Sequence, residues 1–306
     1  MKIWLTGGSG MVGSNLVEHP NAKQYEVLNP TRAELDLLDF ESVNTWISIN
    51  KPDFVIHSAG IVGGIEANIN NPLKFYIENL DIGRNVIWGA RKNNIKYLLN
   101  LGSSCMYPRN APNPLKEEMI LSGELEPTNE GYALAKIIAF KLCEYISKES
   151  KLFQYKTIIP CNIYGRFDKF EAVKSHLVPA VIRKIYNAKI EGQNIVEIWG
   201  DGKARREFMY AGDLVDAIWT AVEGFSDLPS HLNLGLGVDY SINEYYNIIS
   251  KVIGYEGDFV YNLDKPVGMK RKLVAIDKQL KWGWKSKFSL EDGIKATFNY
   301  YLENSL

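Results

Sequence analysis

The chain has 306 residues, of which 46% are apolar and 23% charged, and its formal net charge is −1. These proportions are typical of an ordinary globular protein, and the near-neutral charge argues against nucleic acid or an anionic membrane as a partner. Three cysteines without paired spacing argue against a disulfide framework and against a cysteine zinc site. Without a membrane-length apolar run or a signal-peptide pattern, the sequence predicts a cytoplasmic protein with no bound metal.

Short apolar segments alternate with amphipathic helical segments through the first half of the chain. The predicted strands span 2–6, 25–29, 53–60, 96–104 and 155–165, and the predicted helices span 11–20, 72–94 and 131–149. The connections between them are short. This alternation predicts an α/β fold with a doubly wound parallel sheet, covered by helices on both faces.

The rhythm changes after residue 165. A polar loop and a helix occupy 166–189, and a strand followed by an exposed basic loop is expected at 196–208. A helix at 211–223 and a short strand at 231–235 could rejoin the sheet. We therefore expect one domain made of 1–164 and 208–237, and a smaller, discontinuous substrate domain made of 165–207 and 238–306. The ligand cleft would lie between them, at the carboxyl ends of the strands.

A glycine-rich turn follows the first predicted strand. In "TGGSGMVG", Gly7, Gly10 and Gly13 are three residues apart and stand where a helix begins. A nucleotide pyrophosphate needs such a turn, because its oxygens approach the backbone closely and accept hydrogen bonds from helix N-terminal amides. The position of this loop in a strand–turn–helix unit predicts a Rossmann-type dinucleotide site, with Met11 and Val12 as further contacts.

The end of the second predicted strand indicates which nicotinamide cofactor binds. NAD-binding folds usually carry an acidic residue there, which takes the ribose hydroxyls. Here Asn29 stands at that place, and Arg32 follows it. A guanidinium can hold a 2′-phosphate, so we expect NADPH or NADP as the cofactor. Asp39, further along, is included among the predicted cofactor contacts.

Tyr132 and Lys136 are four residues apart in a predicted helix. This spacing lets the ammonium lie near the phenol and lower its pKa, so that the tyrosine can exchange a proton near neutrality. Together with the glycine loop and with Ser103 in "GSSCMYP", the pair resembles the extended branch of the short-chain dehydrogenase/reductase superfamily. The resemblance implies that Tyr132 donates a proton, Lys136 tunes it and holds the nicotinamide ribose, and Ser103 hydrogen-bonds the substrate oxygen.

Further segments narrow the resemblance. "HSAGIVGGIEANINNP", "LGSSCMYP", "LEPTNEGYALAK", "SHLVPA" and "WGDGKARREF" are together similar to the GDP-L-fucose synthase family. That resemblance spans nearly the whole chain. It implies a homodimer that converts GDP-4-keto-6-deoxy-D-mannose to GDP-L-fucose by NADPH-dependent 3,5-epimerisation and 4-reduction. It also implies that Cys105 and His176 are the acid–base pair of the epimerisation.

The chemistry explains why a thiol and an imidazole are wanted. A ketone at C4 acidifies the hydrogens at C3 and C5, so inversion needs a base on one face and an acid on the other. Both side chains exchange protons near neutral pH. A strand-end cysteine can also be simple packing, which is our interpretation of Cys143 and Cys161.

The expected nucleotide end contains residues of matching type. Trp199 could stack on a guanine, and Arg206 could bind a diphosphate oxygen. The resemblance adds Val178, Lys272 and Asn162, the last of which is also counted among the cofactor contacts.

Two departures from the family pattern leave alternatives open. Ser9 stands where many members carry an arginine near the 2′-phosphate, which weakens the preference for NADP. Lys184, counted as a substrate contact, stands where arginine is common, and the two are not interchangeable at phosphates. A C4-reductase of a GDP-4-keto-6-deoxy-heptose, with partial or no epimerase activity, is therefore an alternative. Cys105, His176 and Arg32 argue against an NAD-dependent nucleotide-sugar 4-epimerase or dehydratase. The presence of Tyr132 and Lys136 argues against a non-enzymatic NADP sensor.

Overall fold

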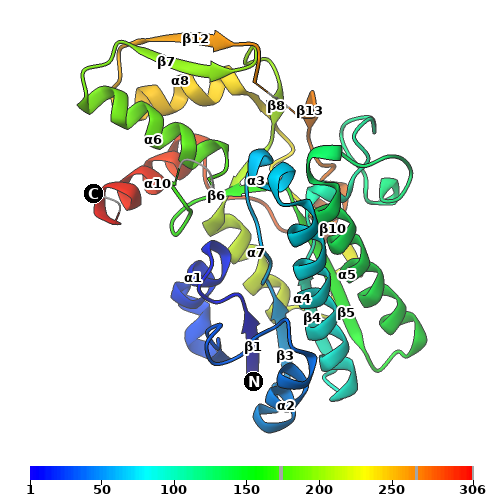
Figure 1. Cartoon of the computed structure of the whole chain (residues 1–306). Coiled ribbons are helices and arrows are strands. Elements are labelled where there is room, and N and C mark those ends of the chain that lie inside the picture. The colour runs from blue at the N-terminus through cyan, green and yellow to red at the C-terminus, as the bar shows by residue number, and fades with distance from the viewer. Residues whose placement is uncertain (172–174, 266–267, 305–306) are drawn as a thin grey trace.

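The computed structural model describes residues 1–171, 175–265 and 268–304, and its centre is a six-stranded sheet (Figure 1). The strand order is β10-β5-β4-β3-β1-β2, and every neighbouring pair is parallel. The strands are β1 (Lys2–Thr6), β2 (Glu26–Leu28), β3 (Phe54–His57), β4 (Tyr97–Leu101), β5 (Gln154–Pro160) and β10 (His231–Leu234). The predicted doubly wound parallel sheet is confirmed, and the segment expected to rejoin it is the edge strand β10.

Helices cover both faces of this sheet (Figure 1). Two of them, α1 (Met11–Glu18) and α7 (Ala211–Glu223), pack against each other on one face. The other face carries α2 (Phe40–Asn50), α4 (Pro72–Lys92) and α5 (Glu130–Glu149). Strands buried on both sides are rich in apolar residues, which explains the largely hydrophobic sequences of β1, β3 and β4.

The carboxyl ends of β1 and β3 are joined through one buried side chain. The Thr6 hydroxyl lies 2.8 Å from His57 Nδ1 and accepts a hydrogen bond of 3.2 Å from the Ala59 backbone amide. The Ser58 hydroxyl donates to the Thr6 carbonyl at 2.6 Å. These bonds fix the turns that follow both strands, where ligands bind in open α/β sheets.

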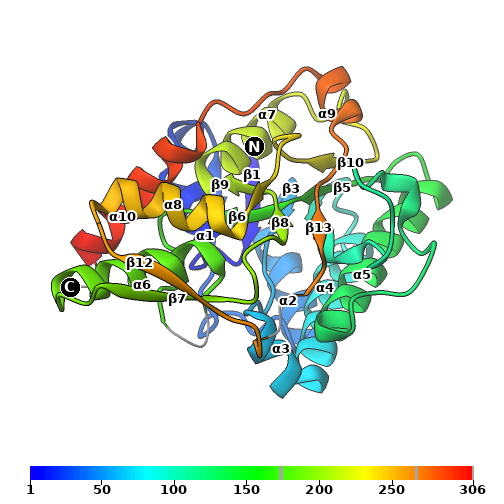
Figure 2. The same ribbon diagram turned by 90° about the horizontal axis from the view of Figure 1, so that it is seen from above.

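A smaller group of elements lies beyond the carboxyl edge of the sheet (Figures 1 and 2). It contains the parallel pair β7–β12, the pair β6–β9 and the three-stranded sheet β11-β8-β13. The strands are β6 (Asn162–Tyr164), β7 (Ile195–Trp199), β8 (Arg205–Arg206), β9 (Phe208–Tyr210), β11 (Tyr240–Ser241), β12 (Asp258–Asn262) and β13 (Arg271–Lys272). The helices of this group are α6 (Leu177–Ile190), α8 (Ile242–Ile253) and α10 (Leu290–Asn304). Helix α3 (Ile65–Asn70) lies against α4, and α9 (Asp277–Trp282) contacts β10 of the large sheet.

Buried side chains divide into separate clusters. Two clusters belong to the two faces of the large sheet, and a third joins α6, α8, α10 and β7. Val274 and Trp284 pack with a sheet cluster although the sequence places them in the second domain. We therefore propose a two-domain division in which the segment around α9 belongs with the sheet.

Three local expectations differ from the structure. The single strand expected at 155–165 is two strands, β5 and β6, which belong to different sheets. Helix α2 has no predicted counterpart. The basic loop expected to be exposed contains β8, whose two arginines are only partly exposed because β11 and β13 pair with it on both sides. In the ranges 1–171, 175–265 and 268–304, no helix is both long and apolar enough to cross a bilayer.

Candidate active site

A cavity of about 530 Å³ opens at the carboxyl edge of the large sheet. It is lined by the turns after β1, β3 and β4, by the start of α5, and by segments around α6, β8 and β13. The structure thus brings together most of the predicted site residues. Those that line the cavity are Gly7, Gly10, Met11, Val12, Gly13, Arg32, Ser103, Cys105, Tyr132, Lys136, Asn162, His176, Arg206 and Lys272.

The glycine loop forms one end of this cavity. Gly7 has φ +73°, a backbone conformation that residues other than glycine rarely adopt. A Cβ added at Gly13 would lie 2.1 Å from the Gly7 carbonyl oxygen. Both positions therefore require glycine. Helix α1 begins directly after this turn, so its first amides face the cavity. A dinucleotide pyrophosphate fits such a cradle.

The turn after β2 provides the other contacts at this end. Arg32 is exposed and lines the cavity together with Ser9 and Asp36. Asp39 has a different place: its carboxylate caps α2 by accepting the Glu41 amide at 3.1 Å, and it borders a separate surface hollow. The structure therefore does not bring Asp39 to the cofactor end, whereas Arg32 remains a candidate contact for a 2′-phosphate.

Ser103, Tyr132 and Lys136 meet where β4 ends. Ser103 caps a short 3-10 turn, Ser104–Met106, and Lys136 donates from its Nζ to the Leu101 carbonyl at 3.0 Å. Burial lowers the pKa of the Lys136 ammonium to about 8. Its Nζ lies 5.9 Å from the centre of the Tyr132 ring.

The expected lowering of the tyrosine pKa is wrong for this structure. Burial raises the pKa of the Tyr132 phenol, the neighbouring Cys105 adds to the rise, and a hydrogen bond with Ser103 offsets only part of it. The reason is that the helical spacing of Tyr132 and Lys136 says nothing about how deeply the phenol is buried. A phenol with a raised pKa stays protonated at neutral pH, which suits a proton donor.

The Cys105 sulfur has two nitrogen partners. Asn129 Nδ2 lies 3.1 Å from it, and Lys272 Nζ lies 3.4 Å from it. Burial acts to raise the pKa of the Cys105 thiol, but the Lys272 charge and the hydrogen bonds outweigh burial and hold that pKa below its ordinary value. The other two cysteines differ, because burial raises the pKa of both Cys143 and Cys161. Cys105 is thus the thiol in the described part of the chain whose surroundings favour the thiolate.

His176 reaches the same cavity from another element. It is the N-cap residue of α6, and its backbone carbonyl accepts the Ala180 amide at 3.1 Å. Burial lowers the pKa of the His176 imidazole, and the charges of Lys272 and Lys169 lower it further. Lys272 therefore acts electrostatically on both members of the predicted acid–base pair.

The predicted substrate residues separate into two groups. Arg206 and Lys272 line the cavity from β8 and β13. The remaining three are absent from its described lining. Val178 is fully buried in the core around α6, Lys184 Nζ donates to the Glu197 carbonyl at 2.5 Å, and Trp199 is 42% exposed.

Sequence reasoning missed two features of this site. The sequence does not identify Asn129 as a contact of the Cys105 sulfur, although Asn129 lies only three residues before Tyr132. Lys272 was assigned to the nucleotide sugar, whereas its ammonium contacts the Cys105 sulfur across 167 positions of sequence. No local pattern encodes a contact of that separation.

Comparison with known proteins agrees with this geometry. The model of the NAD dependent epimerase/dehydratase family matches residues 3–235. The chain belongs to this family. Its relatives include a GDP-L-colitose synthase of Yersinia pseudotuberculosis, which is 56% identical over 99% of this chain and 98% of the relative. A GDP-L-fucose synthase of Azorhizobium caulinodans is 47% identical over 98% of this chain and 96% of the relative.

Solved structures in the family have the same fold. One is MlghC, a GDP-mannoheptose C4 reductase from Campylobacter jejuni with NADP bound, at a TM-score of 0.89. It is 35% identical to this chain, and the match covers 98% of each chain. The Rossmann-type fold predicted from the glycine loop is therefore confirmed.

The first prediction concerns thiol reactivity. At neutral pH we expect iodoacetamide to modify Cys105 in the folded protein well before Cys143 or Cys161, because the thiolate is the reacting form. Replacing Lys272 by Met removes the neighbouring charge and should raise the midpoint pH of Cys105 alkylation by about 1–3 units. Peptide mass spectrometry after timed labelling gives the rate at each cysteine.

The matched control is Lys265→Met, which removes an ammonium that lies 5.1 Å from the Trp199 ring centre. It should leave the alkylation midpoint unchanged. An equal midpoint for wild type and Lys272→Met would contradict the assignment of Lys272 as the stabilising charge.

Proposed function

We propose that this chain is an NADPH-dependent enzyme that epimerises and reduces a GDP-4-keto-6-deoxy-hexose. The observation that carries the proposal is the presence, in one cavity, of two separate proton-exchanging groups. One is Tyr132 with Ser103 and Lys136, and the other is Cys105 with Lys272. A simple reductase needs only the first set.

The reductive half uses the first set. When bound, the cofactor supplies the hydride that reaches C4 of the sugar. The raised pKa of the Tyr132 phenol keeps its proton in place until the ketone oxygen becomes basic. Ser103, at the end of β4, lies where it can donate to that oxygen. The Lys136 ammonium, held by the Leu101 carbonyl, keeps a positive charge beside the developing alkoxide.

The epimerising half uses the second set. A hydrogen next to the 4-ketone is acidic enough for a thiolate to remove it, and Lys272 stabilises that thiolate before substrate binds. The second proton must come from the other face of the ring. His176, which lines the cavity from α6, is the proposed partner, and its lowered pKa makes its protonated form a ready donor.

The GDP moiety is proposed to lie toward Arg206. Arg206 lines the cavity from β8, and its partner in the neighbouring strand β13 is Lys272, which lines the same end. Guanidinium groups bind diphosphate oxygens bidentately, which supports a nucleoside diphosphate sugar. The names of the relatives supply the nucleotide and the sugar class.

The sequence predicts GDP-L-fucose as product, and the 56% identity to a GDP-L-colitose synthase favours a second candidate. Colitose is fucose without its 3-hydroxyl group. A 3-deoxy substrate carries two hydrogens at C3, so inversion has meaning at C5 alone. The two candidates share every step at C4 and C5, and they differ in the 3-hydroxyl and in the inversion at C3.

Incubation in heavy water tests the epimerising half. With GDP-4-keto-6-deoxy-mannose we expect deuterium at C5 and C3 before NADPH is added, and consumption of NADPH afterwards. Cys105→Ala should slow the exchange by about 10²–10⁴-fold, the usual contribution of a positioned acid or base, while still reducing a ketone that is already epimerised. Mass spectrometry and the decay of NADPH absorbance measure the two halves separately.

Cys143→Ala is the matched control, because it removes a buried thiol outside the cavity lining. It should exchange at the wild-type rate. NADPH oxidation by the wild type without any deuterium uptake would contradict the epimerising half and show that the protein is a reductase only. Reaction with no net NADPH consumption would instead indicate a 4-epimerase.

A second assay compares the 6-deoxy ketone with its 3-deoxy counterpart. A site that hydrogen-bonds a 3-hydroxyl rejects the deoxy analogue by about 10⁴-fold, whereas a site without that bond tolerates an added hydroxyl to within about 10²-fold. We expect kcat/KM for the 3-deoxy ketone to be higher than kcat/KM for the ketone with a 3-hydroxyl, or to lie within about 10²-fold of it. A loss of the larger size would assign the protein to GDP-L-fucose formation alone.

A further inference from the structure

Lys272 lies in a very short strand, whose backbone hydrogen bonds are supplemented by side-chain contacts. Strand β13 has two residues, and it pairs in parallel with β8 so that Arg271 faces Arg205 and Lys272 faces Arg206. Successive side chains of a strand point to opposite faces. One face of this pair therefore carries Arg206 and Lys272 into the cavity, and the other carries Arg205 and Arg271 away from it.

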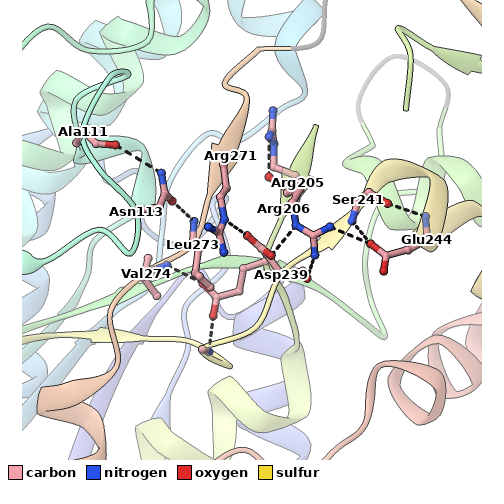
Figure 3. Close-up of polar contacts among 12 residues, drawn as sticks. Ala111, Asn113, Arg205, Arg206, Asp239, Ser241, Glu244, Arg271, Leu273 and Val274 are labelled. Carbon is pink, nitrogen blue, oxygen red and sulfur yellow. Dashed lines mark hydrogen bonds and ion pairs between the residues drawn. The ribbon is translucent and has the colours of Figure 1, made fainter. Parts of the chain in front are cut away.

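The outward face is closed by one buried carboxylate (Figure 3). Asp239 accepts from Arg205 Nε at 2.8 Å through one oxygen and from Arg271 Nε at 2.5 Å through the other. Its backbone carbonyl accepts a further bond from Arg205 at 2.6 Å. Asp239 is only 5% exposed and directly precedes β11, which pairs with the other edge of β8. It therefore bridges the two strands across their outer face.

Side chains also hold the residues that follow Lys272 (Figure 3). Asn113 Oδ1 accepts the Leu273 amide at 2.8 Å, and the buried Glu207 carboxylate accepts the Val274 amide at 2.9 Å. The Glu207 amide in turn donates to the Lys272 carbonyl at 3.2 Å. Lys272 is thus held on its C-terminal side by these amide contacts, and on its N-terminal side by the ionic bridge to Arg271 and by the Arg205 amide, which donates to the Lys270 carbonyl at 2.9 Å.

We propose that Asp239 is a positioning residue that sets the Lys272 ammonium against the Cys105 sulfur by holding β13 to β8. This inference rests on the proposed function only in one respect, the role of the Cys105 thiolate in epimerisation. Asp239 itself touches neither Cys105 nor Lys272 in any recorded bond of the described residues. Its influence on the cavity passes through the backbone of the two paired strands.

The bridge needs a negative charge. Two guanidinium groups that share one carboxylate lie close together, and like charges at that range repel when nothing neutralises them. Burial acts to raise the pKa of Asp239, but Arg271 and Arg205 outweigh burial and hold that pKa below its ordinary value. The carboxylate is therefore ionised throughout the neutral range. An asparagine of the same shape can accept from only one of the two arginines.

The sign of the effect on Cys105 separates positioning from a direct field. The groups that act on the sulfur are Lys272 from β13, Tyr132 and Lys136 from α5, and the side chains of Ser103 and Asn129. Removing a carboxylate anywhere nearby would, by its field alone, favour the thiolate and lower the thiol pKa. If positioning is lost, the Lys272 ammonium can move away from the sulfur, and the pKa of the Cys105 thiol rises.

The test is the pH profile of Cys105 alkylation in Asp239→Asn, measured by peptide mass spectrometry on the protein alone. We expect the midpoint to rise by about half a unit to one unit, which is less than the change expected for Lys272→Met. The matched control is Glu244→Gln. Glu244 also contacts Arg205, at 3.2 Å, but it does not bridge to Arg271, and glutamine keeps the capping bond to the Ser241 amide. Its midpoint should equal that of wild type.

An unchanged or lowered midpoint in Asp239→Asn would overturn the proposal. If that variant does not fold, Arg271→Gln replaces it, because this side chain is 45% exposed and its loss removes the same bridge. Loss of the bridge and loss of a positive charge would both raise this midpoint, so the control is Lys270→Gln, which removes the exposed charge next to Arg271 and leaves the bridge intact. Arg271→Gln should have a higher midpoint than Lys270→Gln, and equal midpoints would overturn the proposal. The assay contains no sugar nucleotide, so failure to turn over GDP-4-keto sugars would contradict the proposed function and leave this result standing.

Discussion

The contact between the Lys272 ammonium and the Cys105 sulfur is the interaction on which the chemistry of this site depends. Burial alone would keep the thiol protonated, as it does at Cys143 and Cys161. The ammonium, together with the hydrogen bonds of Ser103 and Asn129, reverses that balance, and it adds to the lowering of the His176 pKa that burial causes. One positive charge, delivered by a two-residue strand, therefore sets the proton affinity of both groups proposed to invert the sugar. Strands β8, β11 and β13 hold that charge at the edge of the sheet.

The large parallel sheet contributes the rest. Its strands end together, so the turns after β1, β3 and β4 converge on one cavity, and α5 adds Tyr132 and Lys136. A reductase needs this half only. The second half comes from β8, β13 and the start of α6, which reach the cavity from segments far along the chain. The elements that cover the sheet edge therefore supply the side chains that the proposed epimerisation would add to a reductase.

Local sequence patterns predicted what is local in the structure. The strand at β1 and the helix at α7 have the expected bounds, because an apolar run and an amphipathic period mark them directly. The cavity residues of the glycine loop and of β4 followed from position after a strand. The features that could not be predicted from the sequence depend on contacts between residues far apart in the chain. Two-residue strands such as β13 carry no period, and a pKa depends on burial, so the effect of Lys272 on Cys105 and the raised pKa of Tyr132 became visible only in three dimensions.

The central claim is that one cavity contains two proton-transfer centres, Tyr132 and Cys105, whose steps are independent although both groups contact Ser103. The most direct measurement is hydrogen exchange and NADPH oxidation by Tyr132→Phe, with a GDP-4-keto-6-deoxy sugar in heavy water. If the centres are independent, deuterium should enter C5 at a rate within about tenfold of wild type while NADPH oxidation falls by about 10²–10⁴-fold. Loss of both activities in the same proportion would contradict the claim, because it would mean that a single proton donor serves both reactions.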